Sequence, residues 1–519
     1  MRSDAALPHA VFVALALIGT SPTVPARADE AGAARAGEVA HLQKMRQLFP
    51  DAAAGVQPAP AIIPQLRVDP DPGGAIATFQ PSGPTVTAKN AFFSNLGSNG
   101  RTCFTCHQPQ DGWALRAQHV RSRFAVDPND PLFRLVDGAT CPSDNVATPA
   151  QRRKAFALLL GKGLIRIGLP LPAQGLQFRV VDVADPYDCN TNPTTGLTSH
   201  TTGTVSVYRR PLPAANLGFL STIMWDGREP DLFSQARDAT LGHAQATVVP
   251  TTSQQRQIVR FEGCTRADTP PLFATIPRAA GVYTAQLFDD RAFFLDEAGA
   301  AGGPGALFDK VAKFFIGVND PFGSNPTNAT FTPDVFHLYD KWRGLPGNGA
   351  VADARRAIAR GEEVFDTKKI AIAGVAGIND ALGKKSVAGF CATCHDTPAT
   401  GDHSVKAPLD IGVAAAGKKA PPVLDIAGLP VFRLQCTAGP LAGRIFEVTD
   451  PGRALITGQC ADVGKVKGPI LRGLPARAPY FHNGSAASLA DVVDFYDKRF
   501  AIGFTKEEKT DLVAFLSSL

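Results

Sequence analysis

Two five-residue motifs constrain this chain more than any other feature of its sequence. Residues 103–107 (CFTCH) and 391–395 (CATCH) share the pattern C-x-x-C-H. The two thiols of such a motif can add to the vinyl groups of haem, and the histidine that follows can bind the iron. The sequence therefore predicts two covalently bound haem c groups. The attachment cysteines are Cys103, Cys106, Cys391 and Cys394, and the iron-binding histidines are His107 and His395.

Other uses of C-x-x-C fit this sequence less well. A zinc site needs a second pair of ligands nearby, and neither motif is closely followed by one. A thioredoxin-like redox pair does not require a histidine at the same place in both motifs.

The N-terminus has the three parts of an export signal. Arg2 precedes the apolar run 10–19, and residues 26–28 (ARA) offer a small-residue cleavage site. That run is too short to span a bilayer, which takes roughly eighteen or more apolar residues, and no later run reaches this length. We expect a signal peptide at 1–28 and a periplasmic mature protein with no membrane span.

The charge balance excludes one class of function, and the cysteine content predicts disulfide bonds. Lys and Arg number 52 against 47 Asp and Glu, which is too balanced for a dedicated nucleic-acid binder. In an oxidising compartment, the five cysteines outside the two motifs predict two disulfides and one thiol. Proximity favours Cys141–Cys189 and Cys436–Cys460 with Cys264 free, although other pairings stay open.

Helical patterns on either side of the second haem motif, together with the presence of two such motifs, predict a mainly α fold with two c-type cytochrome domains packed together. We expect an N-terminal haem domain at 29–345 and a C-terminal cytochrome domain at 346–519. The latter carries a helical face with Gly361 at its centre and a capping box at Thr505 and Glu508. A loop-rich and partly β insertion is predicted at about 141–212, with strand-like alternation at 177–183 and 204–208.

Two further segments accompany the haem motifs. Residues 225–228 read W-D-G-R, and residues 478–484 read A-P-Y-F-H-N-G. The order C-x-x-C-H, W-D-G-R, C-x-x-C-H and A-P-Y-[FM]-H-x-G resembles the bacterial dihaem cytochrome c peroxidase/MauG family. The resemblance implies that the N-terminal haem reacts with peroxide and that the C-terminal haem relays electrons.

The same resemblance assigns several residue roles. Trp225 would bridge the two haems, and Gln235 matches the distal glutamine of the family. Arg228 and Arg472 are candidate partners of haem propionates, because a guanidinium binds a carboxylate through two hydrogen bonds. A solvated surface role remains open for both arginines.

The sixth ligand of the C-terminal haem departs from the family peroxidases, which use methionine. Tyr496 occupies the matching position, and MauG is similar in having tyrosine there. A phenolate favours ferric iron. His482 is the rival ligand, since relatives of the rubber-oxygenase type carry a bis-histidine haem. Either residue could instead be part of the core.

Two further departures concern the N-terminal haem. The family places a catalytic Glu twenty residues after the bridging Trp, and here that residue is Gln245. An amide cannot exchange protons as a carboxylate does, so His243 is the candidate replacement. The family also binds an inter-domain Ca²⁺ through an Asn that corresponds here to Arg210, a fixed cation that could replace the metal. We therefore regard Ca²⁺ as doubtful.

The leading prediction is a haem-dependent oxidoreductase of the peroxidase class that reacts with H₂O₂. Its electron donor would be a small cytochrome, a cupredoxin or an oxidisable residue of a protein substrate. One alternative is a dihaem oxygenase that resembles rubber oxygenases and uses O₂. A second alternative is an electron-transfer cytochrome without turnover, whose irons would respond to neither oxidant.

Overall fold

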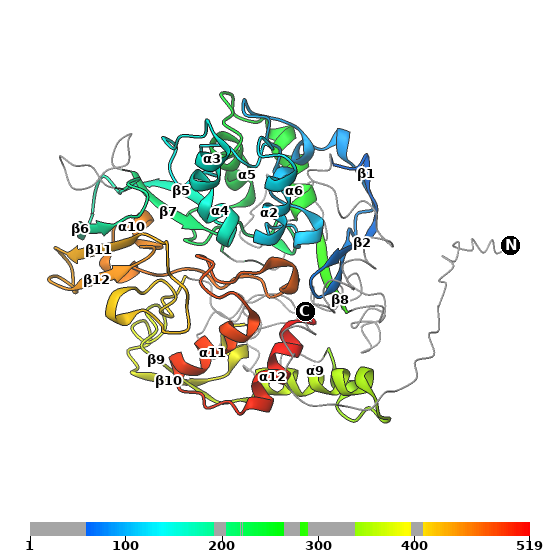
Figure 1. Cartoon of the computed structure of the whole chain (residues 1–519). Helices are drawn as coiled ribbons and strands as arrows, with labels where there is room; N and C mark the ends of the chain where they lie inside the picture. The colour runs from blue at the N-terminus through cyan, green and yellow to red at the C-terminus, as the bar shows by residue number, and fades with distance from the viewer. Residues whose placement is uncertain are drawn as a thin grey trace. The chain divides into compact units, whose positions relative to one another are not determined.

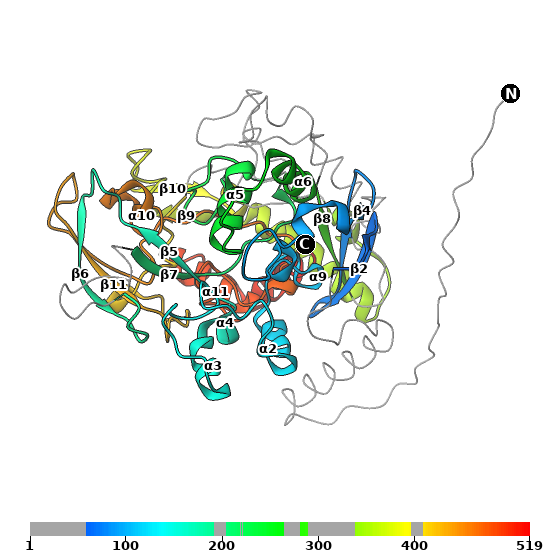
Figure 2. The same ribbon diagram turned by 90° about the horizontal axis from the view of Figure 1, so that it is seen from above.

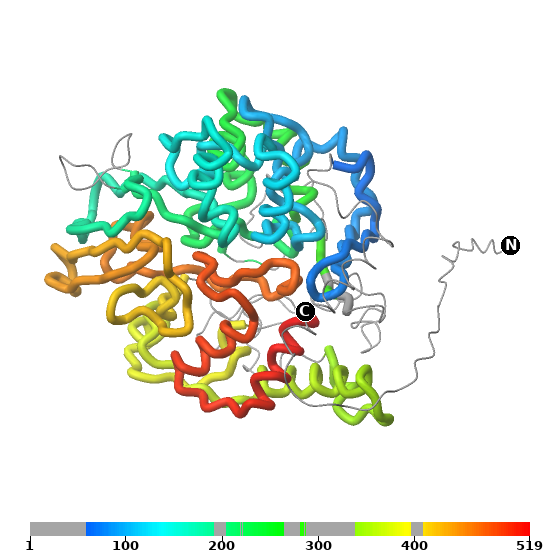
Figure 3. Tube along the Cα trace, in the orientation of Figure 1, coloured from blue at the N-terminus to red at the C-terminus, as the bar shows by residue number. Residues whose placement is uncertain are grey.

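The computed structural model describes residues 59–190, 204–217, 220, 222–263, 281–288, 338–395 and 408–519, which Figure 3 draws in colour. The predicted signal peptide and Cys264 lie outside these residues. Within the described part, the chain forms α-helices and several small antiparallel sheets (Figure 1). No helix there is long and apolar enough to cross a bilayer.

Local capping signals define where several helices begin. Thr505 and Glu508 form the predicted capping box of α12, and Thr251 and Ser488 cap α6 and α11 in the same way. The helices are α2 (Ala117–Val126), α3 (Pro149–Ala155), α4 (Ala157–Lys162), α5 (Leu232–Gly242), α6 (Thr252–Glu262), α9 (Ala350–Thr367), α10 (Ala454–Thr457), α11 (Leu489–Phe500) and α12 (Lys506–Leu516).

Small sheets connect segments that are far apart in the sequence. In the sheet β2-β3-β8, the central strand pairs with neighbours on both sides (Figures 1 and 2), and another sheet has the order β12-β11-β6. The remaining pairs are β1-β4, β5-β7 and β9-β10. The strands are β1 (Ile62–Ile63), β2 (Leu66–Asp71), β3 (Gly74–Phe79), β4 (Thr85–Val86), β5 (Ile165–Pro170), β6 (Phe178–Ala184), β7 (Thr204–Arg209), β8 (Tyr283–Phe288), β9 (Ile370–Ala373), β10 (Ser386–Gly389), β11 (Val431–Cys436) and β12 (Ile445–Val448).

The predicted helical face of α9 packs against α12 (Figure 1). A Cβ atom at Gly361 would lie 1.9 Å from the carbonyl oxygen of Asp511, so only glycine allows the two helices to approach this closely. Ile358 and Phe365 of α9 join Phe515 of α12 in one buried cluster. The glycine predicted to permit a close helix contact therefore does so.

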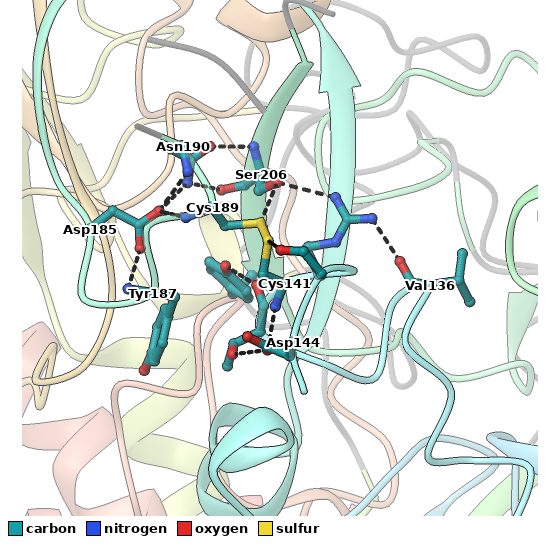
Figure 4. Close-up of a disulfide and its surroundings, with 12 residues drawn as sticks. Val136, Cys141, Asp144, Asp185, Tyr187, Cys189, Asn190 and Ser206 are labelled. Atoms are coloured by element: carbon teal, nitrogen blue, oxygen red, sulfur yellow. Dashed lines mark hydrogen bonds between the residues drawn. A yellow bond between two sulfur atoms is a disulfide. The ribbon is translucent and has the colours of Figure 1, made fainter. Parts of the chain in front are cut away.

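Both predicted disulfides are present. Cys141–Cys189 and Cys436–Cys460 have Cα–Cα distances of 5.4 and 6.0 Å. Figure 4 shows the first of them beside Asp185, whose carboxylate accepts the backbone N–H of Cys189 at 3.0 Å. The predicted strands of the insertion are also found, as β6 and β7, and β6 pairs with β11.

Candidate functional site

The first C-x-x-C-H motif folds as one tight turn. Within η4 (Cys103–Thr105), the backbone N–H groups of Cys106 and His107 donate to the carbonyl of Cys103 at 3.2 and 3.0 Å. The hydroxyl of Thr105 accepts the N–H at the start of the turn at 3.0 Å. A single turn thus holds both cysteines and the histidine, and all three line one cavity. We call this the first cavity.

His107 is held in the form that binds a metal. Its Nδ1 lies 2.8 Å from the carbonyl oxygen of Trp113, so Nδ1 carries the proton and Nε2 carries the lone pair. Burial lowers the pKa of His107 to about 4, which keeps the ring neutral at physiological pH. Metal-binding histidines are typically oriented by such a bond from the other ring nitrogen.

The second motif has the same local structure. In η8 (Cys391–Thr393), the N–H groups of Cys394 and His395 donate to the carbonyl of Cys391 at 3.2 and 3.0 Å. Both cysteines and the histidine line another cavity. We call this the second cavity.

Tyr496 and His482, the two candidate sixth ligands, both line the second cavity but contact different residues. The ring centroid of Tyr496 lies 6.4 Å from that of His395, with the planes at 82°. The ring of His482 instead lies 6.1 Å from that of Trp225, and its Nε2 is 3.8 Å from the carboxylate of Asp450. Burial raises the pKa of Tyr496 and lowers that of His482 to about 4.

Trp225 lines both cavities. Its indole Nε1 donates to the carbonyl of Arg210 at 2.7 Å, and its own carbonyl accepts the N–H of Lys467 at 2.8 Å. Its neighbour Asp226 is buried and accepts from Arg209, which also binds Asp450 through two hydrogen bonds of 2.6 and 2.9 Å. The W-D-G-R motif is thereby fixed to the C-terminal half of the chain.

Gln235 of α5 and His243, at the end of the same helix, both line the first cavity. Gln245 is exposed and does not line it, and its side-chain oxygen accepts from Asn99 at 3.3 Å. The imidazole Nδ1 of His243 lies 2.6 Å from Asp137. Gln245, at the position where the resemblance leads us to expect Glu, is therefore not part of the cavity wall, whereas His243 is.

The residues of both cavities fit haem c. Neither disulfide uses a motif cysteine, so the thiols are not consumed by those bonds. Burial raises the pKa of Cys391 to about 12 and also raises that of Cys103, so these thiols are neutral groups suited to become thioethers. The lone pair on Nε2 of His107 is the further donor that an iron requires. Largely apolar walls suit the face of a macrocycle.

Comparison with known proteins returns cytochrome c peroxidases. Cytochrome-c peroxidase IdrP1 of Pseudomonas sp. (strain SCT) is 41% identical over 81 residues, which are 14% of this chain and 21% of the relative. Cytochrome-c peroxidase IdrP2 of Denitromonas iodatirespirans is 34% identical over 140 residues, or 25% and 36% of the two chains. Cytochrome c551 peroxidase of Nitrosomonas europaea is 32% identical over 112 residues, or 18% and 34%. The resemblance to the bacterial cytochrome c peroxidases is confirmed.

The matches to these peroxidases are partial, since the chain spans about a fifth to about a third of their lengths. No family model matches the chain. Among solved structures, a MauG-like protein associated with microbial copper homeostasis aligns over 61% of this chain and 76% of its own, with 19% identity and a TM-score of 0.26.

The two arginines that the peroxidase resemblance singles out differ in position. Arg228 lines the first cavity, and its guanidinium donates to Asp226 at 3.0 and 3.1 Å. Arg472 is buried, donates to the carbonyl of Thr284 at 3.2 Å and lies outside the walls of both cavities.

Arg210, which the resemblance leads us to expect in place of a calcium-binding Asn, donates hydrogen bonds from its guanidinium to backbone carbonyls. It donates to Lys162 at 2.9 Å, to Leu115 at 2.6 Å and to Arg477 at 2.7 Å. The side chain is buried, and burial lowers its pKa to about 10. Three distant segments thus converge on one fixed positive charge.

Sequence reasoning missed several polar residues of the first cavity, among them Arg101, Asp137 and Glu262. Glu262 is 5% exposed, and one of its carboxyl oxygens has no hydrogen-bond partner among the described residues. Burial raises its pKa to about 8. The three residues belong to no motif, and only their joint position at this cavity marks them.

Proposed function

We propose that the chain is a periplasmic dihaem c-type oxidoreductase that reduces H₂O₂ to two molecules of water. The reaction takes up two protons and two electrons. The electrons come from a small cytochrome, a cupredoxin or an oxidisable residue of a partner protein. The relationship to cytochrome c peroxidases supports this reaction class.

The first haem would be held by Cys103, Cys106 and His107 in a domain at 29–345. The second would be held by Cys391, Cys394 and His395 in a domain at 346–519, with Tyr496 as the favoured sixth ligand and His482 as its rival. Bound in this way, the haems would supply iron that accepts and donates single electrons. Arg210 would hold together the segments that Ca²⁺ joins in the relatives, so no calcium is required.

The protein's own side chains would orient peroxide and move its protons. The amide of Gln235 can donate a hydrogen bond to an oxygen of H₂O₂. The imidazole of His243 can accept a proton and return it, which the amide of Gln235 cannot do. Arg228 is the candidate propionate partner with a position in a cavity wall.

The observation that carries the proposal is the position of Trp225. One indole belongs to the walls of two cavities, each of which contains a C-x-x-C-H motif. An oxidisable ring shared by both cavities suits a protein in which electrons that arrive at one site are used at the other.

Rapid mixing of the half-reduced holoprotein with one equivalent of H₂O₂ tests this function. We expect prompt oxidation of the C-terminal haem in the wild type and slower oxidation in Trp225→Phe. Trp342→Phe is the matched control, because Trp342 is also buried but lines neither cavity. Absence of any peroxide-dependent spectral change in the wild type would contradict the proposal.

The oxygenase alternative keeps one observation in its favour, which is the outward position of Gln245. That alternative predicts a stable complex when O₂ is added to the fully reduced protein. A peroxidase predicts oxidation without such a complex.

A further inference from the structure

A buried ion pair lies directly behind His243 in the first cavity. One oxygen of Asp137 is 2.6 Å from Nδ1 of His243, and the other forms an ion pair with Arg101. Asp137 is 4% exposed and Arg101 is 3% exposed, whereas the side chain of His243 is 36% exposed. The wall therefore contains a chain of three polar groups that leads from a buried guanidinium to an accessible imidazole.

The inner two groups have little freedom to move. Besides Asp137, Arg101 donates to the carbonyls of Pro131 at 2.7 Å, Leu132 at 2.6 Å and His243 at 3.3 Å. Burial opposes ionisation of Asp137, but Arg101 and His243 outweigh it and hold the pKa of this carboxyl at about 2. Asp137 is therefore a fixed carboxylate at every physiological pH.

A carboxylate can only accept from a neutral imidazole, so the bond requires the proton of His243 to be on Nδ1. The other ring nitrogen, Nε2, is then left unprotonated. Asp137 binds this ring directly, Arg101 lies behind Asp137, and His107 lines the same cavity. Glu262 lies in the wall of the same cavity.

We propose that Asp137 and Arg101 are positioning residues that hold His243 as the proton-transfer group of the first cavity, with Nε2 as the reacting atom. This inference rests on the proposed function. Nε2 takes one proton from H₂O₂ and returns it to the departing oxygen, which leaves as water when the O–O bond breaks. The remaining oxygen becomes the second water with two protons from solvent and two electrons from the donor.

The first test is the tautomer of His243 in ¹⁵N-histidine-labelled holoprotein. The protein is reduced and bound to carbon monoxide so that the irons are diamagnetic, and the signal is assigned by its loss in His243→Gln. We expect the Nδ1–H tautomer in the wild type and a mixture in Asp137→Asn. An Nε2–H tautomer in the wild type would overturn the inference even if peroxide is reduced.

The second test is the rate of the peroxide reaction in matched variants. We expect Asp137→Asn to lower this rate roughly 10- to 100-fold, the loss that follows when a metal-binding histidine loses the residue that orients it. His243→Gln should lose roughly 10²- to 10⁴-fold, as expected for a proton-transfer group. Asp130→Asn is the control, because Asp130 is 1% exposed and binds Arg123 at 2.7 and 2.8 Å without touching His243.

The outcomes separate the two proposals. If the wild type does not react with peroxide, the proposed function fails, while the tautomer still tests whether Asp137 and Arg101 position His243. If the wild type reacts rapidly with peroxide, and Asp137→Asn reacts as fast as Asp130→Asn with an unchanged tautomer of His243, the positioning role of Asp137 is wrong. The proposed peroxidase function is then retained. If Asp137→Asn does not fold, the wild-type tautomer and the His243→Gln rate decide the question.

Discussion

The two cavities share an attachment motif and one tryptophan but differ in the chemistry of their walls. The first contains two carboxyl groups, Asp137 and Glu262, together with Arg101 and His243. Among its described lining residues, the second contains no carboxyl group, and its wall near His395 is built from apolar side chains such as Phe365 and Ile372. A motif that binds haem therefore does not by itself fix what the haem does.

This difference suits a division of labour. Reduction of peroxide consumes protons, so the site of that reaction needs groups that can exchange them. Electron relay needs no proton exchange, and an apolar wall with one axial side chain is sufficient. The comparison predicts that changes to the first cavity alter peroxide chemistry and that changes to the second alter potential and electron supply.

The largest effect is expected from removal of one attachment site at a time. The double variant Cys103→Ser/Cys106→Ser should carry one haem instead of two and lose the peroxide reaction entirely. Cys391→Ser/Cys394→Ser should also carry one haem but keep the first reaction of its remaining iron with peroxide. Haem content by alkaline pyridine spectra, combined with rapid mixing, checks both. Equal loss of reaction in the two variants would remove the distinction between the cavities.

Arg210 lines both cavities, so its substitution should disturb both at once. Arg210→Gln leaves buried carbonyls without their donor, which should lower the free energy of unfolding by about 3 kcal/mol. Denaturant unfolding measures this loss, with Arg179→Gln as an exposed arginine control. Chelation of calcium by EDTA should leave the wild-type unfolding curve unchanged. A wild type that EDTA destabilises would show that a metal, and not Arg210, joins these segments.

The variant Tyr496→Phe tests which side chain of the second cavity is the sixth ligand of the C-terminal haem. Loss of a phenolate ligand should raise the reduction potential of the C-terminal haem by about 0.1 V or more, within the roughly 0.8 V range that axial ligands cover. The N-terminal haem should keep its potential. Spectroelectrochemistry measures both, and Tyr339→Phe is a control at another buried tyrosine. An unchanged potential in Tyr496→Phe, with a change in His482→Gln, would assign the ligand to His482.

The buried carboxyl of Glu262 in the first cavity should make the free energy of unfolding depend on pH. Its pKa is about 8 in the folded protein against an ordinary 4.5, so the folded state keeps a proton that the unfolded state releases. Stability should therefore fall as pH rises from about 4.5 to about 8, by up to about 1.4 kcal/mol per unit. Glu262→Gln should make the fall in stability between pH 6 and 7 less steep in denaturant unfolding, while Asp71 and Glu362, whose pKa values burial also raises to about 7, keep part of it. Exposed Glu363→Gln should keep the full wild-type slope, and a Glu262→Gln slope as steep as that of the wild type would contradict the prediction.

Much of the local structure could be predicted because its causes are local. The capping box at Thr505 and Glu508 needs only residues three apart, and Gly361 is marked by its place in an apolar helical face. Pairing Cys141 with Cys189 and Cys436 with Cys460 followed from short separations in an oxidising compartment. The strands β6 and β7 followed from alternation of apolar residues.

The surroundings of His243 in the first cavity could not be predicted from local sequence patterns. Asp137 is 106 residues from His243, and no spacing rule connects them. The outward position of Gln245 depends on how the chain turns after α5, which the identity of the residue does not reveal. Arg472 looked equivalent to Arg228 in the sequence, yet only Arg228 lines a cavity.

By itself, the sequence determined that two C-x-x-C-H motifs flank a W-D-G-R segment, and each motif has the spacing of cysteine and histidine that covalent haem attachment would require within one turn. It also determined the helix starts and the close contact at Gly361. Only the tertiary structure decided that Trp225 belongs to both cavities and that Asp137 and Arg101 stand behind His243. Attachment is a local property of the backbone, whereas the polarity of each cavity is set by burial and by contacts between residues far apart in the chain.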